Sequence, residues 1–500
     1  MHMLIVVIAI VFGCCVVGID LWCRLPRRAP VAAAGGTGPF LFPSGFLWGA
    51  ATADHQIERS QPDNWSAFER EARAHLRQDR LTKGVVQPGH IADIANVPLA
   101  WMELKGDFDT HYDDDLALAA DLGHSAHRFS ISWARLFPRA GMTAPDDDGL
   151  AFYDGVFASL QRHGLAPFVT LFHFASPQWL WQKNKNGKRG LESADAIVAF
   201  ELFVRVVVER WGPQVRSWCT LNEPMVVVYS GYLEGTFPPN ERRAGPKDVV
   251  DVGAQLLRMH AAAFHIIKRA DANASVGIAQ HVRCFLPLRN FNPLDRLQAH
   301  LIEQAFTLDF LDAIASGIYA PIMTGISMEI PGLKGTADYL GVNYYGRFYI
   351  RSTGLMTYDV VTHDKEDSAE EETDVGWAID EMSLVPTLVQ FHRRYGLPIH
   401  ILENGMADHA VDDVKRQRFL VRHIQALWQA LQKDVDVHSY FHWSLVDNFE
   451  WALGFTPRFG LYAVDYDKNQ LRTPRGSVDV YRSIAAANSV APDVWARFRR

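Results

Sequence analysis

Short apolar runs separated by amphipathic stretches fill the chain from about residue 40 onward. Eight of these runs have the length and composition of buried strands, at residues 46–52, 126–132, 167–172, 216–221, 275–280, 338–344, 398–402 and 437–443. Between them, apolar residues recur at the spacing of a helix with one buried face, as at residues 113–122, 194–211 and 414–431. Alternating strands and helices predict a parallel sheet, and eight repeats predict that the sheet closes into a barrel.

The predicted fold class is therefore α/β, with a single (β/α)8 TIM barrel that carries long loops after its strands and follows an amino-terminal hydrophobic helix. A barrel with long loops accommodates more than ~400 residues in one domain, so the 500 residues of this chain require no second domain. We assign residues 40–490 to the barrel, residues 1–24 to a transmembrane anchor and residues 25–39 to a linker. The linker is rich in Pro, Ala and Gly.

The amino-terminal segment, residues 3–19, is an uninterrupted apolar run near the lower length limit for a membrane-spanning helix. Arg24, Arg27 and Arg28 follow the run, whereas a secretory signal peptide carries its basic residues before it. The positive-inside rule then predicts an uncleaved single-helix anchor with the barrel on the cytoplasmic side. Two alternatives remain: cleavage near the alanines at residues 32–34, which would export the barrel, and a lipoprotein box at residues 11–14, which matches poorly and lies inside the apolar run.

Composition excludes several classes of partner and cofactor. The formal net charge of −8 argues against a nucleic-acid partner, which would favour a basic surface. Of the five cysteines only Cys219 and Cys284 fall in the barrel, which predicts buried thiols rather than a disulfide framework. The sequence contains neither a Cys-x-x-Cys nor a His-Glu-x-x-His motif, so we expect no metal and no cofactor.

Two of the apolar runs end in a glutamate beside an asparagine. The fourth run continues into Asn-Glu-Pro at residues 222–224, and the seventh continues into Glu-Asn-Gly at residues 403–405. A single glutamate after a strand is more commonly a solvated strand end. A parallel barrel, however, brings its strand ends together at one face, which would place Glu223 and Glu403 across one pocket. Glycoside hydrolysis requires such a pair, one carboxyl group to donate a proton and one carboxylate to face a cationic transition state.

Further motifs accompany this pair in a fixed order. They are Phe-Leu-Trp-Gly-Ala-Ala-Thr at 46–52, Arg-Phe-Ser-Ile-Ser-Trp at 128–133, Thr-Leu-Phe-His-Phe at 170–174, Gly-Val-Asn-Tyr-Tyr at 341–345 and His-Trp-Ser-Leu-Val-Asp-Asn-Phe-Glu-Trp at 442–451. Together they show that the chain resembles the family 1 glycoside hydrolases, the β-glucosidase and β-galactosidase family, from about residue 40 to about residue 481. The resemblance implies an exo-acting β-glycosidase that retains anomeric configuration, uses no cofactor and acts on a small β-glycoside or oligosaccharide.

The same resemblance assigns Glu223 as the general acid/base and Glu403 as the nucleophile. Arg128 and Tyr345 match family positions that contact the nucleophile, and both would favour its ionised form. Glu223 has to be protonated when the substrate arrives. We expect burial and the second carboxylate to raise the pKa of Glu223 for this purpose.

Sugar recognition is implied for residues that match family positions contacting ring hydroxyls or the face of the sugar. They are Gln56, His173, Asn222, Asn343, Tyr345, Trp443, Glu450, Trp451 and Phe459. Trp443 matches the aromatic platform under the sugar ring, and Phe459 matches an apolar wall. Glu450 corresponds to the carboxylate at the 4- and 6-hydroxyls, where a negative charge would repel a 6-phosphate, so we expect a non-phosphorylated substrate.

Three functions compete on these observations. The leading one is a β-glucosidase. The second is a transglycosidase that uses an alcohol or a lipid as acceptor, and the third is a membrane-tethered sugar-binding pseudoenzyme. The presence of both Glu223 and Glu403 argues against the pseudoenzyme.

One acidic segment, residues 359–374, contains three consecutive glutamates at residues 370–372. Runs of like charge are usually solvated. We therefore predict a surface loop there, which could also line the mouth of the pocket because it follows the sixth strand.

Overall fold

The structure is a computed structural model that describes residues 38–83, 94, 96–364, 366–367 and 370–499. The predicted anchor and nearly all of the predicted linker lie outside these residues. Within the described part of the chain, none of the helices combines the length and the apolar character needed to cross a bilayer.

Eight parallel strands form the centre of the molecule, and their order in the sheet follows their order in the chain. The last strand pairs with the first, and β6 pairs with β9, so the sheet closes into the predicted barrel. The strands are β2 (Leu47–Ala51), β3 (Ala126–Ser130), β4 (Ala166–Phe172), β5 (Ser217–Asn222), β6 (Ser275–Pro287), β9 (Tyr339–Ser352), β11 (Ile399–Asn404) and β12 (Val437–Trp443).

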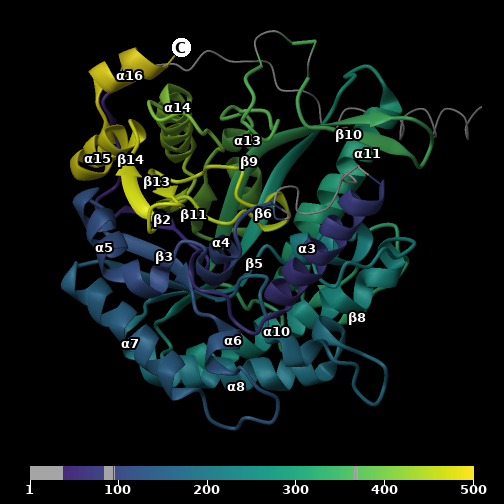
Figure 1. The fold of residues 1–500 in the computed structure, drawn as a ribbon. Coiled ribbons are helices and arrows are strands. Elements are labelled where there is room, and N and C mark those ends of the chain that lie inside the picture. The colour runs from purple at the N-terminus through teal and green to yellow at the C-terminus, as the bar shows by residue number, and fades with distance from the viewer. Residues whose placement is uncertain (1–37, 84–93, 95, 365, 368–369, 500) are drawn as a thin grey trace, which may run out of the picture.

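Helices surround the strands and cover the outside of the barrel (Figure 1). The long covering helices are α5 (Phe108–Asp121), α7 (Asp147–Arg162), α8 (Ala194–Trp211), α10 (Val250–Ala270), α13 (Leu384–Tyr395), α14 (Val414–Leu431) and α15 (Ser477–Ala487). The others belong mostly to the connections: α2 (Asp54–Ile57), α3 (Asn64–Lys83), α4 (Leu99–Leu104), α6 (Trp133–Leu136), α9 (Pro224–Val228), α11 (Pro293–Glu303), α12 (Asp309–Ser316) and α16 (Pro492–Phe498). The predicted helices at residues 194–211 and 414–431 are confirmed to the residue, and the third, predicted at 113–122, begins earlier.

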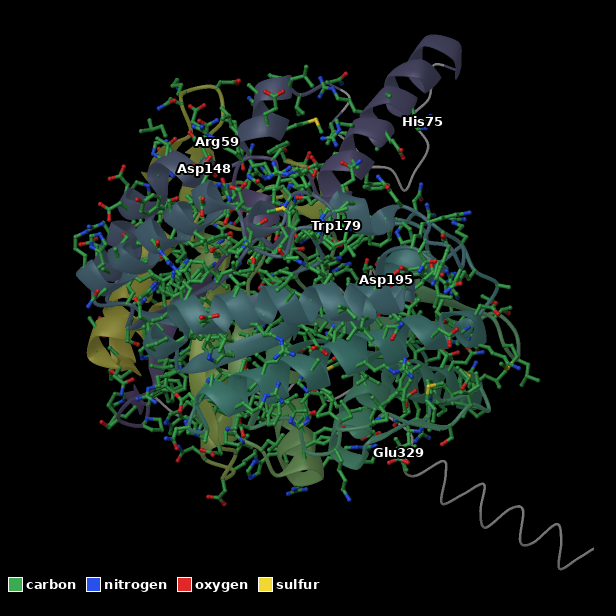
Figure 2. The ribbon with its side chains drawn as sticks, turned by 90° about the horizontal axis from the view of Figure 1, so that it is seen from below. Arg59, His75, Asp148, Trp179, Asp195 and Glu329 are labelled. Carbon is green, nitrogen blue, oxygen red and sulfur yellow. The ribbon has the colours of Figure 1, made fainter. Side chains whose placement is uncertain are left out.

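Acidic side chains lie in the first turns of two covering helices, where a negative charge complements the helix dipole. Asp148 belongs to the first turn of α7 and Asp195 to that of α8. Both are labelled in the view from below in Figure 2, which shows the side chains on the outside of the barrel. The side chains of Asp146 and Ser193 cap the same helix starts by accepting hydrogen bonds from the backbone N–H groups of Gly149 and Asp195.

The two ends of the described chain pack against each other at the edge of the main hydrophobic core. Strand β1 (Phe40–Leu41) pairs with β15 (Ser489–Val490), and the ring of Phe40 packs 5.3 Å from that of Trp495 in α16. Trp495 is 1% exposed. The folded body therefore continues through α16, beyond the predicted boundary at residue 490.

Two barrel strands continue well past their predicted ends. Strands β6 and β9 remain paired as far as Pro287 and Ile350, and β10 (Tyr358–Val361) adds an antiparallel strand to β9. The apolar-run criterion missed this extension because His281, Arg283 and charged residues of β9 interrupt it. The extended ladder rises above the barrel rim and forms one side of its opening, whereas the hairpins β7 (Ile318–Tyr319)–β8 (Met328–Glu329) and β13 (Tyr462–Asp465)–β14 (Leu471–Pro474) lie outside the barrel sheet.

The prediction that residues 359–374 form a solvated loop is wrong in part. The first residues belong to β10, and the side chain of Glu370 is only 1% exposed. Its carboxylate accepts hydrogen bonds from Arg347 at 2.6 Å and from the Tyr349 hydroxyl at 2.7 Å. Glu371 accepts one from Arg418 at 2.6 Å. Arginines that are distant in sequence neutralise these charges, which a local charge pattern does not reveal.

Candidate active site

The two glutamates lie at the carboxyl ends of two barrel strands that are separated by β6 and β9, and both line one cavity, as predicted. Glu223 directly follows β5 and is 6% exposed, and Glu403 lies in β11 and is 4% exposed. The backbone of Glu223 has a φ of 46°, an unfavourable conformation for a residue with a side chain and one that clusters at functional sites. Behind Glu403, a Cβ at Gly405 would lie 1.9 Å from the Trp443 carbonyl oxygen, so only glycine fits.

Glu403 is held by one cation and one hydroxyl group. Arg128, in β3, donates from Nη1 to Oε1 of Glu403 at 2.6 Å, and Tyr345, in β9, donates its hydroxyl hydrogen to Oε2 at 2.8 Å. Both contacts were predicted, and both favour the ionised carboxylate. Burial opposes them and raises the pKa of Glu403 to about 7.

Glu223 is held by two different donors. His281 Nδ1 lies 2.8 Å from its Oε1, and Asn343 Nδ2 donates to the same oxygen at 2.8 Å. Burial acts to raise the pKa of Glu223, but the interaction with His281 and the hydrogen bonds from His281 and Asn343 together lower it below its ordinary value. The expectation that the free protein raises the pKa of Glu223 is therefore wrong.

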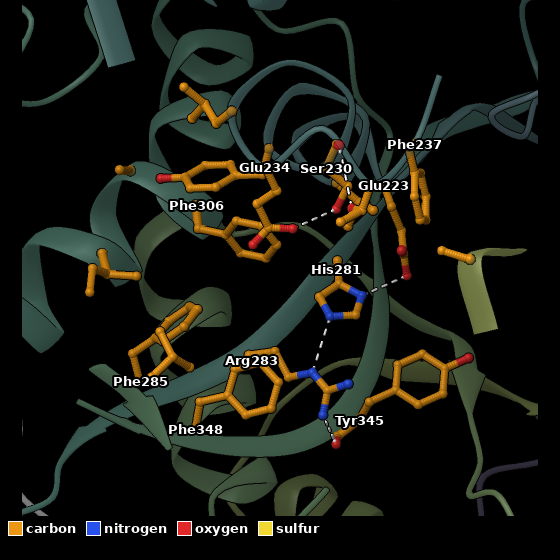
Figure 3. Close-up of a pocket in the computed structure, with 18 of the residues that line it drawn as sticks. Glu223, Ser230, Glu234, Phe237, His281, Arg283, Phe285, Phe306, Tyr345 and Phe348 are labelled. Carbon is orange, nitrogen blue, oxygen red and sulfur yellow. Dashed lines mark hydrogen bonds and ion pairs between the residues drawn. The ribbon is translucent and has the colours of Figure 1, made fainter. Parts of the chain in front are cut away.

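His281 is the site residue that the sequence analysis missed. Arg283 donates from Nε to Nε2 of His281 at 3.2 Å, so this nitrogen is an acceptor and Nδ1 carries the hydrogen that Glu223 accepts. Figure 3 shows this chain from Tyr345 through Arg283 and His281 to Glu223. A signal was present, because residues 281 and 283 follow the fifth apolar run with the alternation that places two side chains on one face of a strand.

One hydrogen-bonded network joins the two carboxylates. Asn222 Oδ1 accepts from Arg128 Nη2 at 2.7 Å and from Asn343 Nδ2 at 3.0 Å. Arg128 also contacts Glu403, and Asn343 also contacts Glu223. The network fixes the positions of both carboxylates, and two such groups in one pocket titrate as a coupled pair.

A second polar group forms a fork at the opposite side of the pocket. Gln56 Nε2 donates to the Phe449 carbonyl at 2.7 Å and to Glu450 Oε2 at 3.1 Å. Asn448 Nδ2 donates to the same Glu450 oxygen at 2.9 Å. Removal from water raises the pKa of Glu450 to about 7, against these hydrogen bonds.

Aromatic rings complete this part of the pocket. The His173 ring stacks on Trp451 with centroids 5.9 Å apart, and Trp443 lies at the same distance from His173. His173 Nε2 accepts from the amide of Asn222 at 2.9 Å. Its Nδ1 and Gln56 Oε1 are buried and have no partner among the described residues. Buried polar atoms are normally paired, and hydroxyl groups of a sugar supply suitable partners.

A single cavity of about 1030 Å³ contains the predicted site. The residues that line it include His173, Asn222, Glu223, Tyr345, Glu403, Trp443, Glu450, Trp451 and Phe459. The remaining predicted residues, Gln56, Arg128 and Asn343, contact these residues directly. The structure thus brings every sequence-predicted site residue to one place.

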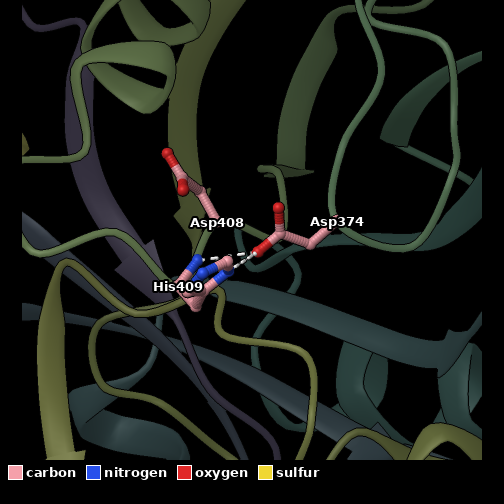
Figure 4. A group of neighbouring side chains, drawn as sticks. All are labelled: Asp374, Asp408 and His409. Carbon is pink, nitrogen blue, oxygen red and sulfur yellow. Dashed lines mark hydrogen bonds and ion pairs between the residues drawn. The ribbon is translucent and has the colours of Figure 1, made fainter.

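Outside this cavity, Asp374, Asp408 and His409 form a group with the composition of a metal site (Figure 4). One atom of each side chain that could bind a metal ion lies within 4.8 Å of the corresponding atoms of the other two. Contacts within the protein account for most of its geometry. The backbone N–H and Nδ1 of His409 contact Asp374 Oδ2 at 2.8 and 2.5 Å, and Asp408 Oδ1 accepts from the Ala410 N–H at 3.1 Å. We interpret the group as a link between the loops that follow β10 and β11.

Known proteins resemble this chain in sequence and in fold. The model of glycosyl hydrolase family 1 matches residues 39–490. β-Glucosidase A of Thermotoga maritima is 31% identical, with 90% of this chain and 98% of that protein covered, and β-glucosidase 25 of Oryza sativa is 31% identical, with 89% and 94% covered. The structure of a β-glycosidase from Pyrococcus horikoshii matches with a TM-score of 0.78 at 32% identity, over 93% of this chain and 99% of that one.

The chain therefore belongs to glycosyl hydrolase family 1. It is an enzyme, a β-glycosidase that acts with retention of anomeric configuration.

Proposed function

We propose that this enzyme hydrolyses terminal, non-phosphorylated β-D-glucosides, with Glu403 as nucleophile and Glu223 as general acid/base. The observation that supports this assignment is the difference between the hydrogen-bond partners of the two glutamates. Glu403 is held by a guanidinium and a hydroxyl group, which suits a group that reacts as an anion, whereas Glu223 contacts an imidazole ring and an amide. Relatives named β-glucosidases, among them a Thermotoga maritima structure in complex with glucoimidazole at 28% identity, support the choice of sugar.

In the first step the Glu403 carboxylate attacks the anomeric carbon while Glu223 gives its proton to the glycosidic oxygen. The bond to the aglycone breaks, and a glycosyl ester on Glu403 forms. Attack requires the ionised form of Glu403, so the productive complex has the proton of the coupled pair on Glu223. Arg128 and Tyr345 favour this arrangement because both stabilise the Glu403 anion.

In the second step Glu223, now a carboxylate, removes a proton from a water molecule that attacks the ester. The free sugar leaves with its original configuration because two inversions occur at the same carbon. His281 contributes here, since its Nδ1–H stabilises the carboxylate form of Glu223 that must act as the base.

The fork of Gln56 and Glu450 accounts for the choice of a neutral sugar. Gln56 Oε1, which has no partner among the described residues, and the Glu450 carboxylate offer acceptors to ring hydroxyls, and the negative charge of an ionised Glu450 would repel a 6-phosphate. The neighbouring rings of Trp443 and Trp451 provide an apolar surface for the C–H groups of the sugar.

A panel of p-nitrophenyl glycosides tests the proposal with the full-length protein. We expect the β-glucoside to have the highest kcat/KM, the 6-phosphorylated β-glucoside to be inert and the α-glucoside to be inert. Proton NMR of the early reaction should show β-glucose before its mutarotation. A first product in the α configuration, or no hydrolysis of any β-glycoside, would overturn the mechanism.

We further propose that residues 1–24 anchor the enzyme in a membrane with the barrel on the cytoplasmic side. The support is the apolar run at residues 3–19 and the arginines that follow it. Full-length protein should sediment with membranes, a chain that begins at Pro39 should stay in the supernatant with the same kcat, and protease added to intact cells should leave the barrel uncut. A mature chain that begins after Ala34 would show that the segment is a cleaved signal peptide.

A further inference from the structure

The cavity has a second half that the sugar site does not use. Beyond Glu223 it continues along the extended β6–β9 ladder, where Phe285, Phe306 and Phe348 line it (Figure 3). The Phe285 ring lies 5.8 Å from that of Phe306 and 6.2 Å from that of Phe348. With residues of α11 and β9, these side chains form a small apolar cluster separate from the main core. The cluster therefore gives one wall of the cavity a hydrocarbon surface.

The opposite wall is also apolar. Val226, Leu233 and Phe237 line it from α9 and from the segment that follows α9. All three side chains are half-buried. Two apolar walls with a passage between them resemble the lining of sites that bind apolar ligands.

Apolar side chains also surround the mouth of this passage. Leu355 and Met356 are each 70% exposed, and Tyr358 and Val360 are 42% and 46% exposed. All four line the cavity and lie on β10 or on the turn before it. Single exposed apolar residues are ordinary, but a contiguous group at the entrance to a site marks a surface that binds something apolar.

Several polar donors in this half make hydrogen bonds within the protein, whereas Gln298 Oε1 is buried without a partner among the described residues. Gln298 donates from its amide to the carbonyls of Gly354 and Leu355 at 2.8 and 3.0 Å. The Ser230 hydroxyl donates to Glu234 at 3.3 Å, and Arg283 donates to His281. A second sugar residue would need a hydroxyl-binding fork like that of Gln56 and Glu450. The contacts here favour a hydrocarbon, which needs only apolar surface.

We propose that the natural substrate is an amphiphile, a β-glycoside of a long-chain alcohol whose hydrocarbon chain lies between the Phe285–Phe306–Phe348 wall and the opposite wall. This inference rests on the proposed β-glycosidase function and specifies its aglycone. The sugar occupies the polar end, the glycosidic oxygen lies at Glu223, and the end of the chain reaches the rim at Leu355 and Met356. Hydrolysis releases the free sugar and the long-chain alcohol.

A homologous series tests the length of the site. Full-length enzyme is assayed on methyl, butyl, octyl and dodecyl β-D-glucosides below their micellar concentrations, with cellobiose and p-nitrophenyl β-glucoside as references. We expect kcat/KM to rise by up to about 4-fold for each methylene group that becomes buried. Hydrolysis of p-nitrophenyl β-glucoside with no dependence on chain length would overturn the inference alone, whereas no hydrolysis of any β-glycoside would overturn the proposed function.

Variants at the rim of the cavity test where the hydrocarbon chain of the substrate lies. The double variant Leu355→Asp, Met356→Asp changes only well-exposed side chains, so its fold should be intact. We expect the advantage of the dodecyl over the octyl glucoside to disappear, a loss of roughly 10-fold or more by the same transfer scale, while the advantage of butyl over methyl persists. The matched control is Leu471→Asp, at a 55% exposed leucine of β14 that does not line this cavity. Unchanged chain-length dependence in the double variant, or an equal loss in the control, would contradict the proposal.

Discussion

The ends of β5 and β11 present the same side chain at nearly the same burial, yet they differ in what surrounds it. Glu403 contacts the permanent cation of Arg128 and the hydroxyl group of Tyr345. Glu223 contacts the ring of His281 and the amide of Asn343. Arg128 stabilises the ionised form of Glu403 against burial, which raises the pKa of this carboxyl to about 7, whereas His281 and Asn343 hold the pKa of Glu223 below its ordinary value in the free protein. The comparison shows that the role of each glutamate is set by residues from other strands.

The largest effect should come from removing Glu403. Glu403→Gly leaves no group to form the ester, and we expect kcat to fall by about 10⁶-fold, as for other nucleophile deletions. External azide should restore turnover and give a glycosyl azide of inverted configuration, identified by NMR. Glu201→Gln, on the exposed face of α8, should keep full activity. Wild-type turnover in the Glu403 variant would exclude it as the nucleophile.

Removing Glu223 should have an effect that depends on the leaving group. In Glu223→Ala, the first step on alkyl glucosides should slow by about 10²- to 10⁴-fold because a poor leaving group needs the proton. Dinitrophenyl β-glucoside should lose far less in a pre-steady-state burst assay, because its phenolate leaves unprotonated. Equal losses on both substrates would show that Glu223 is not the acid.

Tyr345→Phe removes the hydroxyl group that donates to Glu403 and keeps the aromatic ring. The hydroxyl group donates to the ionised form, so its loss should raise the pKa of Glu403 and move the acidic limb of the kcat/KM profile to higher pH. A hydrogen bond to a charged group contributes about 1.5–3 kcal/mol, so kcat/KM near neutral pH should fall by roughly 10- to 100-fold. A change confined to the alkaline limb would contradict the conclusion that the Tyr345 hydroxyl group stabilises the ionised form of Glu403.

His281→Asn should have the smallest effect on rate and the clearest effect on pH. His281 and its hydrogen bond help to lower the pKa of Glu223, so removing the ring should raise that pKa. The acid then stays protonated to higher pH, and the alkaline limb of the profile should move upward. Arg283→Gln, which removes the donor to His281 Nε2, should move the limb in the same direction. An alkaline limb that stays in place in both variants would exclude His281 as a positioning residue.

Much of the fold and of the site could be predicted from local patterns. The run at residues 437–443 and the helices at 194–211 and 414–431 are confirmed to the residue, because a buried strand and a one-sided helix leave clear periods in the sequence. The two glutamates were singled out because they follow apolar runs and a parallel barrel gathers its strand ends at one face, whereas Gln56 and Glu450 were identified only through the family resemblance.

By itself the sequence determined the barrel, the two glutamates and the group of side chains that the barrel gathers around them. Only the tertiary structure decided how the glutamates differ, because His281 reaches Glu223 from β6 and Arg128 reaches Glu403 from β3. It also decided that Glu370 is buried against Arg347, and that three phenylalanines from β6, β9 and the segment after α11 form one apolar wall. The physical reason is the same in each case. A pKa and the character of a pocket depend on distances between side chains that are far apart in sequence, and those distances exist only once the barrel has closed.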